Sequence, residues 1–341
     1  MRAAFGEEFD VPDGYLNTAS IGIPSVAIGD AVADALVGWR VGAGRASEFD
    51  EPVARAREGF ADLIGVGVDR VAMGPAVSAL IGLVAAAVPD RTRVLVAGGE
   101  FTSVTWPFAA QAGRGVEVTE VDLGQVGRRA GEFDLVAVST VQSADGRLVD
   151  LDALRAARAS GTKVVLDATQ SLGWLDADLS WADAVVAAGY KWLLSPRGSA
   201  WMAIRPELAA VPVAAGWYAS ADRWADVYGL PMTLAPDARA LDTSPAWYCH
   251  VGAAVALPWL AGLDRAAVHA HCVGLADTFR AGLGMEPAGS AIVSVRREGA
   301  RERLAAAGVM SAARAGAARL AFHLYNTDDD VARALDALTA R

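Results

Sequence analysis

Short apolar runs alternate with helical patterns between about residues 93 and 204, and this alternation predicts a mostly parallel sheet covered by helices. The runs are short enough for strands buried on one or both faces, and they comprise residues 93–97, 116–121, 134–138, 163–166, 184–187 and 200–204. Residues 151–159 form the clearest helical pattern, because Asp150 and Asp152 supply an acidic first turn and Gly161 follows its end. The pattern therefore predicts an α/β fold.

After residue 204 the pattern loosens into a loop-rich segment with several prolines, and a long helix is expected to follow it. From about residue 263 we expect a helix to about 283, a strand at 291–296, a helix at 301–307, a strand at 318–322 and a closing helix from about 327. These elements would form a smaller α/β domain. We predict a large domain over residues 16–262 and a small domain built from residues 1–15 and 263–341.

Composition narrows the class of protein. Hydrophobic residues make up 53% of the 341 positions and charged residues 21%, which favours a compact globular chain. The formal net charge of -10 would repel nucleic acid and anionic lipid. Two cysteines and no apolar signal core in residues 1–8 indicate a cytoplasmic protein.

Two charge-free stretches, residues 71–89 and 243–263, approach the length of a membrane span. Prolines punctuate both stretches, and long apolar runs of this kind are also typical of fully buried helices. We therefore predict no membrane segment.

The chain contains only two lysines, Lys163 and Lys191. Lys191 follows one predicted strand and Asp167 ends the preceding one, 24 positions earlier, which is about one crossover connection. Ligands of open α/β sheets bind outside the carboxyl ends of the strands, so both side chains would face one crevice. A lysine amine beside a carboxylate suits pyridoxal phosphate chemistry, in which the lysine forms an imine with the cofactor and the carboxylate keeps the pyridine nitrogen protonated. The alternative is a surface lysine and an Asp167 that caps a helix starting near Thr169.

Three further motifs extend this interpretation: Tyr15-Leu16-Asn17-Thr18-Ala19-Ser20, Asp167-Ala168-Thr169-Gln170 and Gly189-Tyr190-Lys191-Trp192. In order and spacing they resemble the class V aminotransferases, a fold-type-I group of pyridoxal-phosphate-dependent enzymes that includes cysteine desulfurases, selenocysteine lyases, kynureninases and isopenicillin N epimerase. The resemblance runs nearly end to end. It implies a mostly parallel central sheet with helices on both faces, a smaller C-terminal α/β domain, and pyridoxal 5'-phosphate as cofactor.

The resemblance also implies roles for single residues around the cofactor ring. Lys191 would form the Schiff base and take the α-proton of the substrate, Asp167 would bind the pyridinium nitrogen, and Gln170 would donate to the phenolic oxygen. Phe101, in Glu100-Phe101-Thr102, would cover the ring face, although a buried core phenylalanine is the alternative. Gln142 would contact the cofactor from the segment after the strand at 134–138.

The phosphate site departs from the family pattern. Gly74-Pro75-Ala76-Val77-Ser78 forms the glycine-led turn into a helix, where relatives usually carry a hydroxyl residue at the position of Ala76. Backbone N–H groups around Ala76 and Val77 can still hold phosphate, and the Tyr190 hydroxyl would compensate, although weaker cofactor affinity is possible. Ser244, before Pro245, resembles a residue inserted from the neighbouring subunit, which implies a homodimer with its active site at the interface.

The substrate side is expected near the C-terminus. Arg319, in Arg319-Leu320-Ala321-Phe322-His323-Leu324-Tyr325-Asn326-Thr327, resembles the arginine that binds the carboxylate of a small amino acid through two donors. Asn17 and Ser20 would complete this region from the N-terminal segment.

Departures from the family pattern limit the reaction. No cysteine follows Cys272, so the thiol nucleophile of a cysteine desulfurase is missing, and the Cys and His spacings match no established zinc pattern. We expect transamination first, with a carbon–sulfur or related β-elimination lyase, an epimerase or racemase, and a catalytically weak binding or regulatory protein as alternatives. A Schiff-base aldolase without cofactor is a weaker hypothesis, because it would leave Asp167 without a role.

Overall fold

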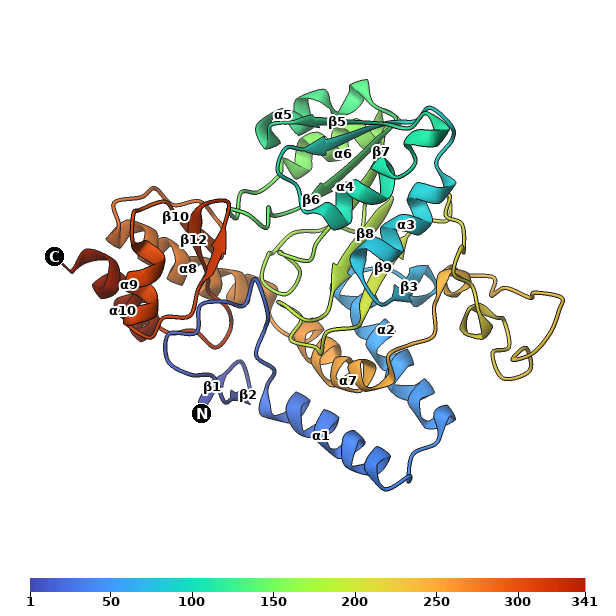
Figure 1. Ribbon diagram of the computed structural model, residues 1–341, viewed down its shortest axis with the longest axis horizontal. Helices are drawn as coiled ribbons and strands as arrows, with labels where there is room; N and C mark the ends of the chain where they lie inside the picture. The colour runs from blue at the N-terminus through green and yellow to red at the C-terminus, as the bar shows by residue number, and fades with distance from the viewer. Residues whose placement is uncertain (341) are drawn as a thin grey trace.

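The computed structural model describes residues 1–340, and its centre is a seven-stranded sheet with the order β3-β9-β8-β7-β6-β4-β5 (Figure 1). The strands are β3 (Val71–Gly74), β4 (Arg93–Ala97), β5 (Glu117–Val121), β6 (Leu135–Ser139), β7 (Lys163–Asp167), β8 (Ala184–Ala188) and β9 (Ala200–Ile204). Strands β4 to β8 pair in parallel, whereas β9 is antiparallel to both β8 and β3. The predicted mostly parallel sheet is confirmed.

Helices cover both faces of this sheet. One face packs against α3 (Val77–Ala87) and α4 (Thr102–Ala109). The other face packs against α2 (Asp50–Ile64), α5 (Leu123–Arg129), α6 (Leu151–Ala159) and α7 (Trp247–Ala261). Successive strand side chains point to opposite faces, so each strand feeds two separate apolar cores. This arrangement confirms the predicted α/β class.

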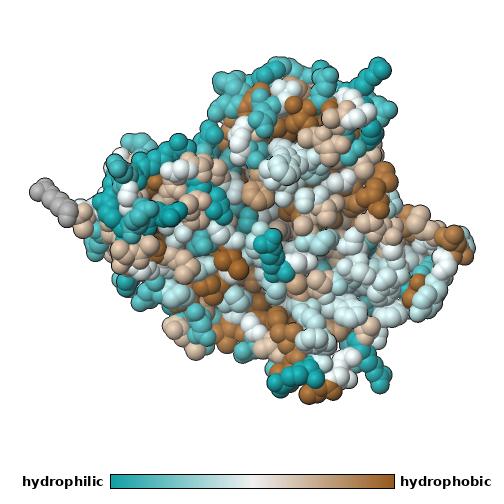
Figure 2. Space-filling view, viewed as in Figure 1, coloured by the Kyte–Doolittle hydropathy of each residue, from teal (hydrophilic) through white to brown (hydrophobic). Residues whose placement is uncertain are grey.

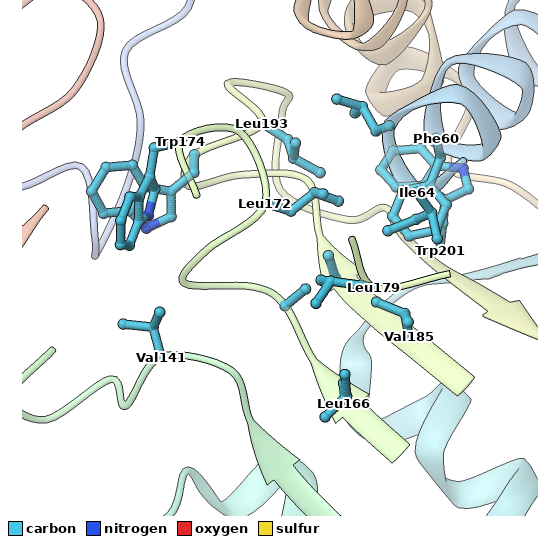
Figure 3. Close-up of a cluster of buried hydrophobic side chains, with 14 of the residues drawn as sticks. Phe60, Ile64, Val141, Leu166, Leu172, Trp174, Leu179, Val185, Leu193 and Trp201 are labelled. Carbon is cyan, nitrogen blue, oxygen red and sulfur yellow. The ribbon is translucent and has the colours of Figure 1, made fainter. Parts of the chain in front are cut away.

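Aromatic side chains fill the larger of these two cores. Phe60 of α2 stacks on Trp201 of β9 with ring centroids 5.9 Å apart, and Ile64 lies beside them (Figure 3). Trp174, in the loop after β7, lies 5.7 Å from Trp192 between ring centroids. The loops that follow β7 and β8 are thus anchored in the core rather than free on the surface.

A three-stranded antiparallel sheet, β10-β12-β11, lies beside the large sheet. It is built from β10 (Ile292–Val295), β11 (Ala312–Arg314) and β12 (Ala317–Ala321), and it packs against α8 (Arg265–Gly282), α9 (Ala300–Ala306) and α10 (Asp328–Thr339). The N-terminal hairpin of β1 (Arg2–Ala4) and β2 (Glu7–Phe9) is tied to this region, because Arg2 forms a 2.6 Å ion pair with Asp330 of α10. The division into domains at residues 16 and 263 stays a prediction.

The sequence pattern places α8, β10, α9, β12 and the start of α10 to within a few residues, but it does not indicate strand β11 or the early strand β3. Residues 71–89 look like one long apolar run, whereas the structure has β3 and then α3, separated by Pro75 and Ala76. Val71 and Met73 pack with the α2 core and Ala72 with the α3 core, so the alternation is real but only four residues long. A run that is apolar on both faces hides its own period.

Apolar side chains are exposed to solvent on several parts of the chain, including one helix end and one long loop. Helix α1 (Val26–Arg40) ends near Trp39, which is 67% exposed, and the long loop between β9 and α7 projects from the molecule (Figure 1). At the end of that loop Tyr228 is 93% exposed and Leu230 90%, and Figure 2 shows apolar side chains at this edge.

Within residues 1–340, no single helix combines the length and apolar character needed to cross a bilayer. Helices α7 and α8, bent by 96° relative to each other, meet that test only when taken together, by length and composition alone.

Candidate active site

Lys191 and Asp167 line the same cavity at the carboxyl ends of β7 and β8. Asp167 is the last residue of β7 and is aligned with Val186 of the parallel strand β8, and Lys191 follows three residues after the end of β8. The cavity has a volume of about 360 Å³. The two side chains therefore share one crevice, as their positions in the sequence predict.

A tight turn fixes the backbone of Lys191. The N–H of Ser195 donates to the carbonyl of Gly189 at 2.9 Å, and the N–H of Gly22 donates to the carbonyl of Tyr190 at 2.9 Å. Gly22 approaches so closely that a Cβ there would lie 2.0 Å from the carbonyl oxygen of Lys191. The N-terminal segment thus locks the turn that carries the lysine.

The amine of Lys191 lies among apolar and aromatic groups. Its Nζ is 5.3 Å from the ring centroid of Phe101 and 5.6 Å from that of Tyr190. Burial lowers the pKa of Lys191 to about 8, although the negative charge of Asp167 opposes the shift. A large share of this amine is therefore neutral and nucleophilic near pH 8.

Asp167 shows the opposite shift. Burial raises the pKa of Asp167 to about 6, while hydrogen bonding to Thr169 and the charge of Lys191 limit the rise. Its Oδ1 accepts from the Thr169 N–H at 2.8 Å, but residues 169–174 form turns and no helix begins there, so the alternative of a helix cap is wrong. Asp167 also lines the cavity, where its carboxylate can meet a ligand.

Gln170 also lines the cavity, but its amide is fully engaged. Its Nε2 donates to the carbonyl of Ala19 and to the hydroxyl of Ser143, both at 3.0 Å, and its Oε1 accepts from Trp192 Nε1 at 2.8 Å. These contacts fix which end of the amide faces Ser143. A donor role toward a ligand would require exchange of one of the two Nε2 bonds.

Phe101 is 45% exposed and faces the cavity, so the alternative of a buried core phenylalanine is wrong. Its ring lies beside the Lys191 amine, and its role as a cover for the cofactor ring stays a prediction. Phe101 also precedes α4, whose first residues Thr102 and Ser103 line the same cavity.

Glu100 organises this edge of the sheet, a role that the sequence analysis did not assign. Its carboxylate accepts from the Ser139 N–H at 2.7 Å, the Ser139 hydroxyl at 2.6 Å, the Phe101 N–H at 2.8 Å and Gln142 Nε2 at 2.8 Å. Gln142 is thereby turned toward Glu100 and does not line the cavity. The available signal was an acidic residue three positions after the end of a predicted strand.

Arg319, which is 1% exposed, is bound only by neutral oxygens. Its Nη1 donates to the Ser143 carbonyl at 2.5 Å and the Ser143 hydroxyl at 3.1 Å, and its Nη2 donates to the Ser20 hydroxyl at 2.8 Å. Burial is the main cause that lowers the pKa of Arg319 to about 10, and the positive charge of Arg314 adds to the shift. The guanidinium remains a cation, and no carboxylate within residues 1–340 neutralises it.

The remaining predicted residues fall into two groups. Ala76, Val77 and Tyr190 line the cavity with Lys191, Asp167, Gln170 and Phe101. The residues that do not line it are Gly74, Ser244, Arg319, Asn17 and Ser20. Arg319 nevertheless donates to the cavity-lining Ser143, and the Ser20 hydroxyl accepts from Arg319. The Ser244 hydroxyl instead accepts from Trp217 Nε1 at 2.8 Å, and Asn17 forms an isolated bridge with Ala321.

Neither cysteine lines this cavity. Cys272 lies buried beside His323, and burial raises the pKa of its thiol far above the usual range. Cys249 donates to the carbonyl of Arg197 at 3.1 Å, and burial raises its pKa as well. Both remain protonated near neutral pH, and no group of three metal-ligating side chains is found in residues 1–340.

Comparisons with known proteins agree with this geometry. A family model described as aminotransferase class-V matches residues 38–302. An uncharacterized aminotransferase of Bacillus subtilis, YcbU, is 29% identical over 320 residues, which cover 86% of this chain and 85% of the relative. Isopenicillin N epimerase of Streptomyces clavuligerus is 31% identical over 170 residues, covering 45% of this chain and 43% of that enzyme.

Solved structures share the whole fold. The cysteine desulfurase CsdA of Escherichia coli superposes with a TM-score of 0.82 at 19% identity, covering 97% of this chain and 96% of that one. The cystine C-S lyase C-DES, solved with its product cysteine persulfide, superposes with a TM-score of 0.84 at 18% identity, covering 97% and 98%. At these identities the likeness describes the fold.

Proposed function

Because the chain belongs to the class V aminotransferase family, we propose that it is a pyridoxal-phosphate-dependent enzyme acting on a small amino acid, with transamination as the favoured reaction. One observation carries this proposal. Lys191 and Asp167 line one cavity, and burial shifts their pKa values toward each other, to about 8 and about 6. Such a pair is typical of a catalytic site.

The residues present fit the cofactor. The cavity offers an amine at Lys191 for the aldehyde, a carboxylate at Asp167 for the pyridine nitrogen, and the start of α3 for the phosphate. When bound, pyridoxal phosphate supplies an aldehyde and a protonated ring that accepts the electrons left at the α-carbon of an amino acid.

Lys191 serves as nucleophile and as base. Its lowered pKa makes the neutral amine available near pH 8, where a free lysine would be almost fully protonated. Lys191 is also the one lysine that lines the cavity among residues 1–340. The same amine can therefore take the α-proton and return it to a different carbon, which transamination requires.

The Asp167 carboxylate would pair with the positive charge of the protonated pyridine nitrogen. Its burial is unfavourable for a free carboxylate, and a cationic partner relieves that cost. Arg319 would bind the substrate carboxylate, because it is a buried cation that only neutral oxygens contact within the described chain.

The two thiols argue against persulfide chemistry, because neither faces the cavity and both keep raised pKa values. Epimerisation is the second candidate, favoured by the 31% identity to isopenicillin N epimerase. A β-elimination lyase and a weak binding or regulatory protein remain further alternatives within the same site.

We also propose a homodimer with its active sites at the subunit interface. The support is that Ser244 lies outside the cavity of its own chain and that the loop between β9 and α7 carries exposed apolar side chains. On this proposal Ser244 completes the cavity of a second copy, and the chain has no nucleic acid or membrane partner.

The first test is an absorbance titration of the purified protein with pyridoxal phosphate, in parallel with Lys191→Ala and Lys163→Ala. We expect an absorbance band at about 410 to 430 nm in the wild type and in Lys163→Ala, and no such band in Lys191→Ala. The rate of band growth should rise with pH and level off above about pH 8, because the neutral amine reacts. A band that survives in Lys191→Ala would contradict the proposal.

Product analysis then separates the reactions. Transamination of an amino acid yields its keto acid and needs a second keto acid to continue, whereas β-elimination releases ammonia and the leaving group in each turnover. Epimerisation leaves the amino acid intact but inverts the α-carbon and, in D₂O, introduces deuterium there. If no amino acid gives any of these products in a protein that shows the band, the binding or regulatory alternative is favoured.

A further inference from the structure

Ser199 lies at the junction of three strand ends next to the cavity. Gly74 of β3 and Ala188 of β8 both pair with Ala200 of β9, so Ser199 is one step beyond this row. The Gly189 N–H donates to the Ser199 carbonyl at 3.0 Å. Ser199 therefore stands between the start of α3 and the turn that carries Lys191.

The hydroxyl of Ser199 has no hydrogen-bond partner within residues 1–340, although the residue is only 1% exposed and lines the cavity. Buried hydroxyl groups are nearly always paired, because leaving one unsatisfied costs free energy. An unsatisfied hydroxyl at a cavity wall indicates a polar ligand at that wall.

The start of α3 presents further donors at the same place. Ala76 occupies the N-cap position without a side-chain cap, and the first helical hydrogen bonds are donated by Ala79 and Leu80. The N–H groups of Val77 and Ser78, which line the cavity, precede those bonds. In an 11-residue helix these free donors and the helix dipole favour an anion.

Arg197 supplies the positive charge. Its guanidinium lies 5.1 Å from the centre of the Tyr190 ring, and it is the one arginine that lines the cavity in the described structure. Its backbone is held where the Cys249 thiol donates to the Arg197 carbonyl. The guanidinium lies against the face of an aromatic ring, and this contact leaves its N–H donors available to bind a phosphate.

We propose that Arg197 and Ser199, together with the start of α3, form the subsite for a phosphate monoester dianion, namely the phosphate of the cofactor. This inference rests on the proposed function. Ser199 supplies the hydroxyl that Ala76 lacks, and Arg197 supplies a charge that a backbone cradle alone does not provide. Arg197 and Ser199 lie in the segment just before β9, and the start of α3 follows β3.

The test compares the affinity of the protein for pyridoxal phosphate with its affinity for pyridoxal, which lacks the phosphate. Both affinities are measured by absorbance titration of the wild type and of the variants Arg197→Ala, Arg197→Lys and Ser199→Ala. We expect the affinity for pyridoxal phosphate to fall about 10-fold or more in Arg197→Ala and about 3- to 10-fold in Ser199→Ala. The affinity for pyridoxal should stay within about twofold of the wild type, and Arg197→Lys should recover part of the loss.

Two matched controls accompany the test. Arg128→Ala removes an exposed arginine on α5, and Ser195→Ala removes a buried hydroxyl that donates to the Leu193 carbonyl and does not line the cavity. Arg128→Ala should keep wild-type affinity for each ligand, whereas Ser195 belongs to the turn that carries Lys191, so an equal loss for both ligands in Ser195→Ala would report damage to that turn rather than to a phosphate contact.

The outcomes are distinguishable. Full affinity for pyridoxal phosphate in both Arg197→Ala and Ser199→Ala would overturn the subsite and leave the proposed function intact. Equal losses for pyridoxal and pyridoxal phosphate would also overturn it, because the effect would not depend on the phosphate. A wild-type protein without a Lys191-dependent band would overturn the proposed function, and the subsite with it.

Discussion

At the scale of single residues, burial decides the chemistry of the site. The same loss of solvent lowers the pKa of Lys191 to about 8 and raises that of Asp167 to about 6, because each group is less stable when charged. Their mutual attraction opposes both shifts without cancelling them. The result is an amine that is partly neutral and a carboxylate that is charged at the same pH.

Asp167 should therefore destabilise the cofactor-free protein at neutral pH. Its folded pKa, about 6, exceeds the ordinary value of 3.8, so the stability it contributes is complete below about pH 3.8 and is lost as the pH rises through 6. We expect Asp167→Asn to raise the free energy of unfolding at pH 8 by about 1 to 3 kcal/mol.

Urea unfolding of the cofactor-free protein at pH 8 and pH 4.5 checks this prediction. The gain of Asp167→Asn over the wild type should shrink at the lower pH, where the aspartate is largely protonated in the folded state. A gain that does not depend on pH would show that the charge of Asp167 is not its cause.

At the scale of elements, the site depends on connections that are short and closely packed. The end of β4 is joined to the end of β6 through Glu100, and the turn after β8 is held by the N-terminal segment through Gly22. Each contact joins residues far apart in the sequence. The position of Lys191 thus depends on packing beyond its own strand.

Gly22→Ala should disrupt this packing. A Cβ at residue 22 would lie 2.0 Å from the Lys191 carbonyl oxygen and 2.7 Å from a methyl carbon of Leu194, so the N-terminal segment must move. We expect a loss of about 1 to 3 kcal/mol in the free energy of unfolding, together with weaker cofactor binding.

Chemical denaturation and the absorbance titration measure the two effects. Gly29→Ala in α1 is the matched control, since a Cβ there meets no atom within 4 Å. That variant should be neutral or slightly stabilised, because alanine favours a helix more than glycine. Wild-type stability in Gly22→Ala would contradict the close contact.

At the scale of the whole molecule, one exposed loop carries several large apolar side chains close together in the sequence. Tyr228, Leu230 and Met232, in the loop between β9 and α7, are 93%, 90% and 64% exposed. Side chains of this kind usually gather where another surface covers them. From this loop the chain continues through Ser244, whose hydroxyl accepts from Trp217, into α7.

The homodimer proposal predicts that this loop contributes to association. Leu230→Asp combined with Met232→Asp should shift the protein from dimer toward monomer, because charges would be buried at the interface. Sedimentation velocity at micromolar concentration measures the shift.

Trp106→Gln, on the exposed side of α4, is the control and should leave the assembly unchanged, since Trp106 is 68% exposed on another element. A wild-type protein that sediments as a monomer would contradict the homodimer, and a double variant that stays fully dimeric would show that the loop is not part of the contact.

The α/β class, the residue ranges of most later elements and the family all follow from the order of amino acids. Helix α6 and strands β4 and β9 have the predicted bounds, because their periodicity and capping residues are local properties. The motif resemblance to class V aminotransferases agrees with the family model over residues 38–302. Lys191 was identifiable from the sequence as well, because the whole chain has only two lysines.

Which side chains meet depends on the folded chain. Strand β3 was hidden because a run buried on both faces has no alternation to read, and Gln142 is turned toward Glu100 by a contact between residues 42 positions apart. Ser199 and Arg197 reach the cavity because β9 runs antiparallel between β3 and β8 and brings its first residues beside their ends. Such meetings depend on strand order and register, and these are set by the packing of the whole chain rather than by neighbouring residues.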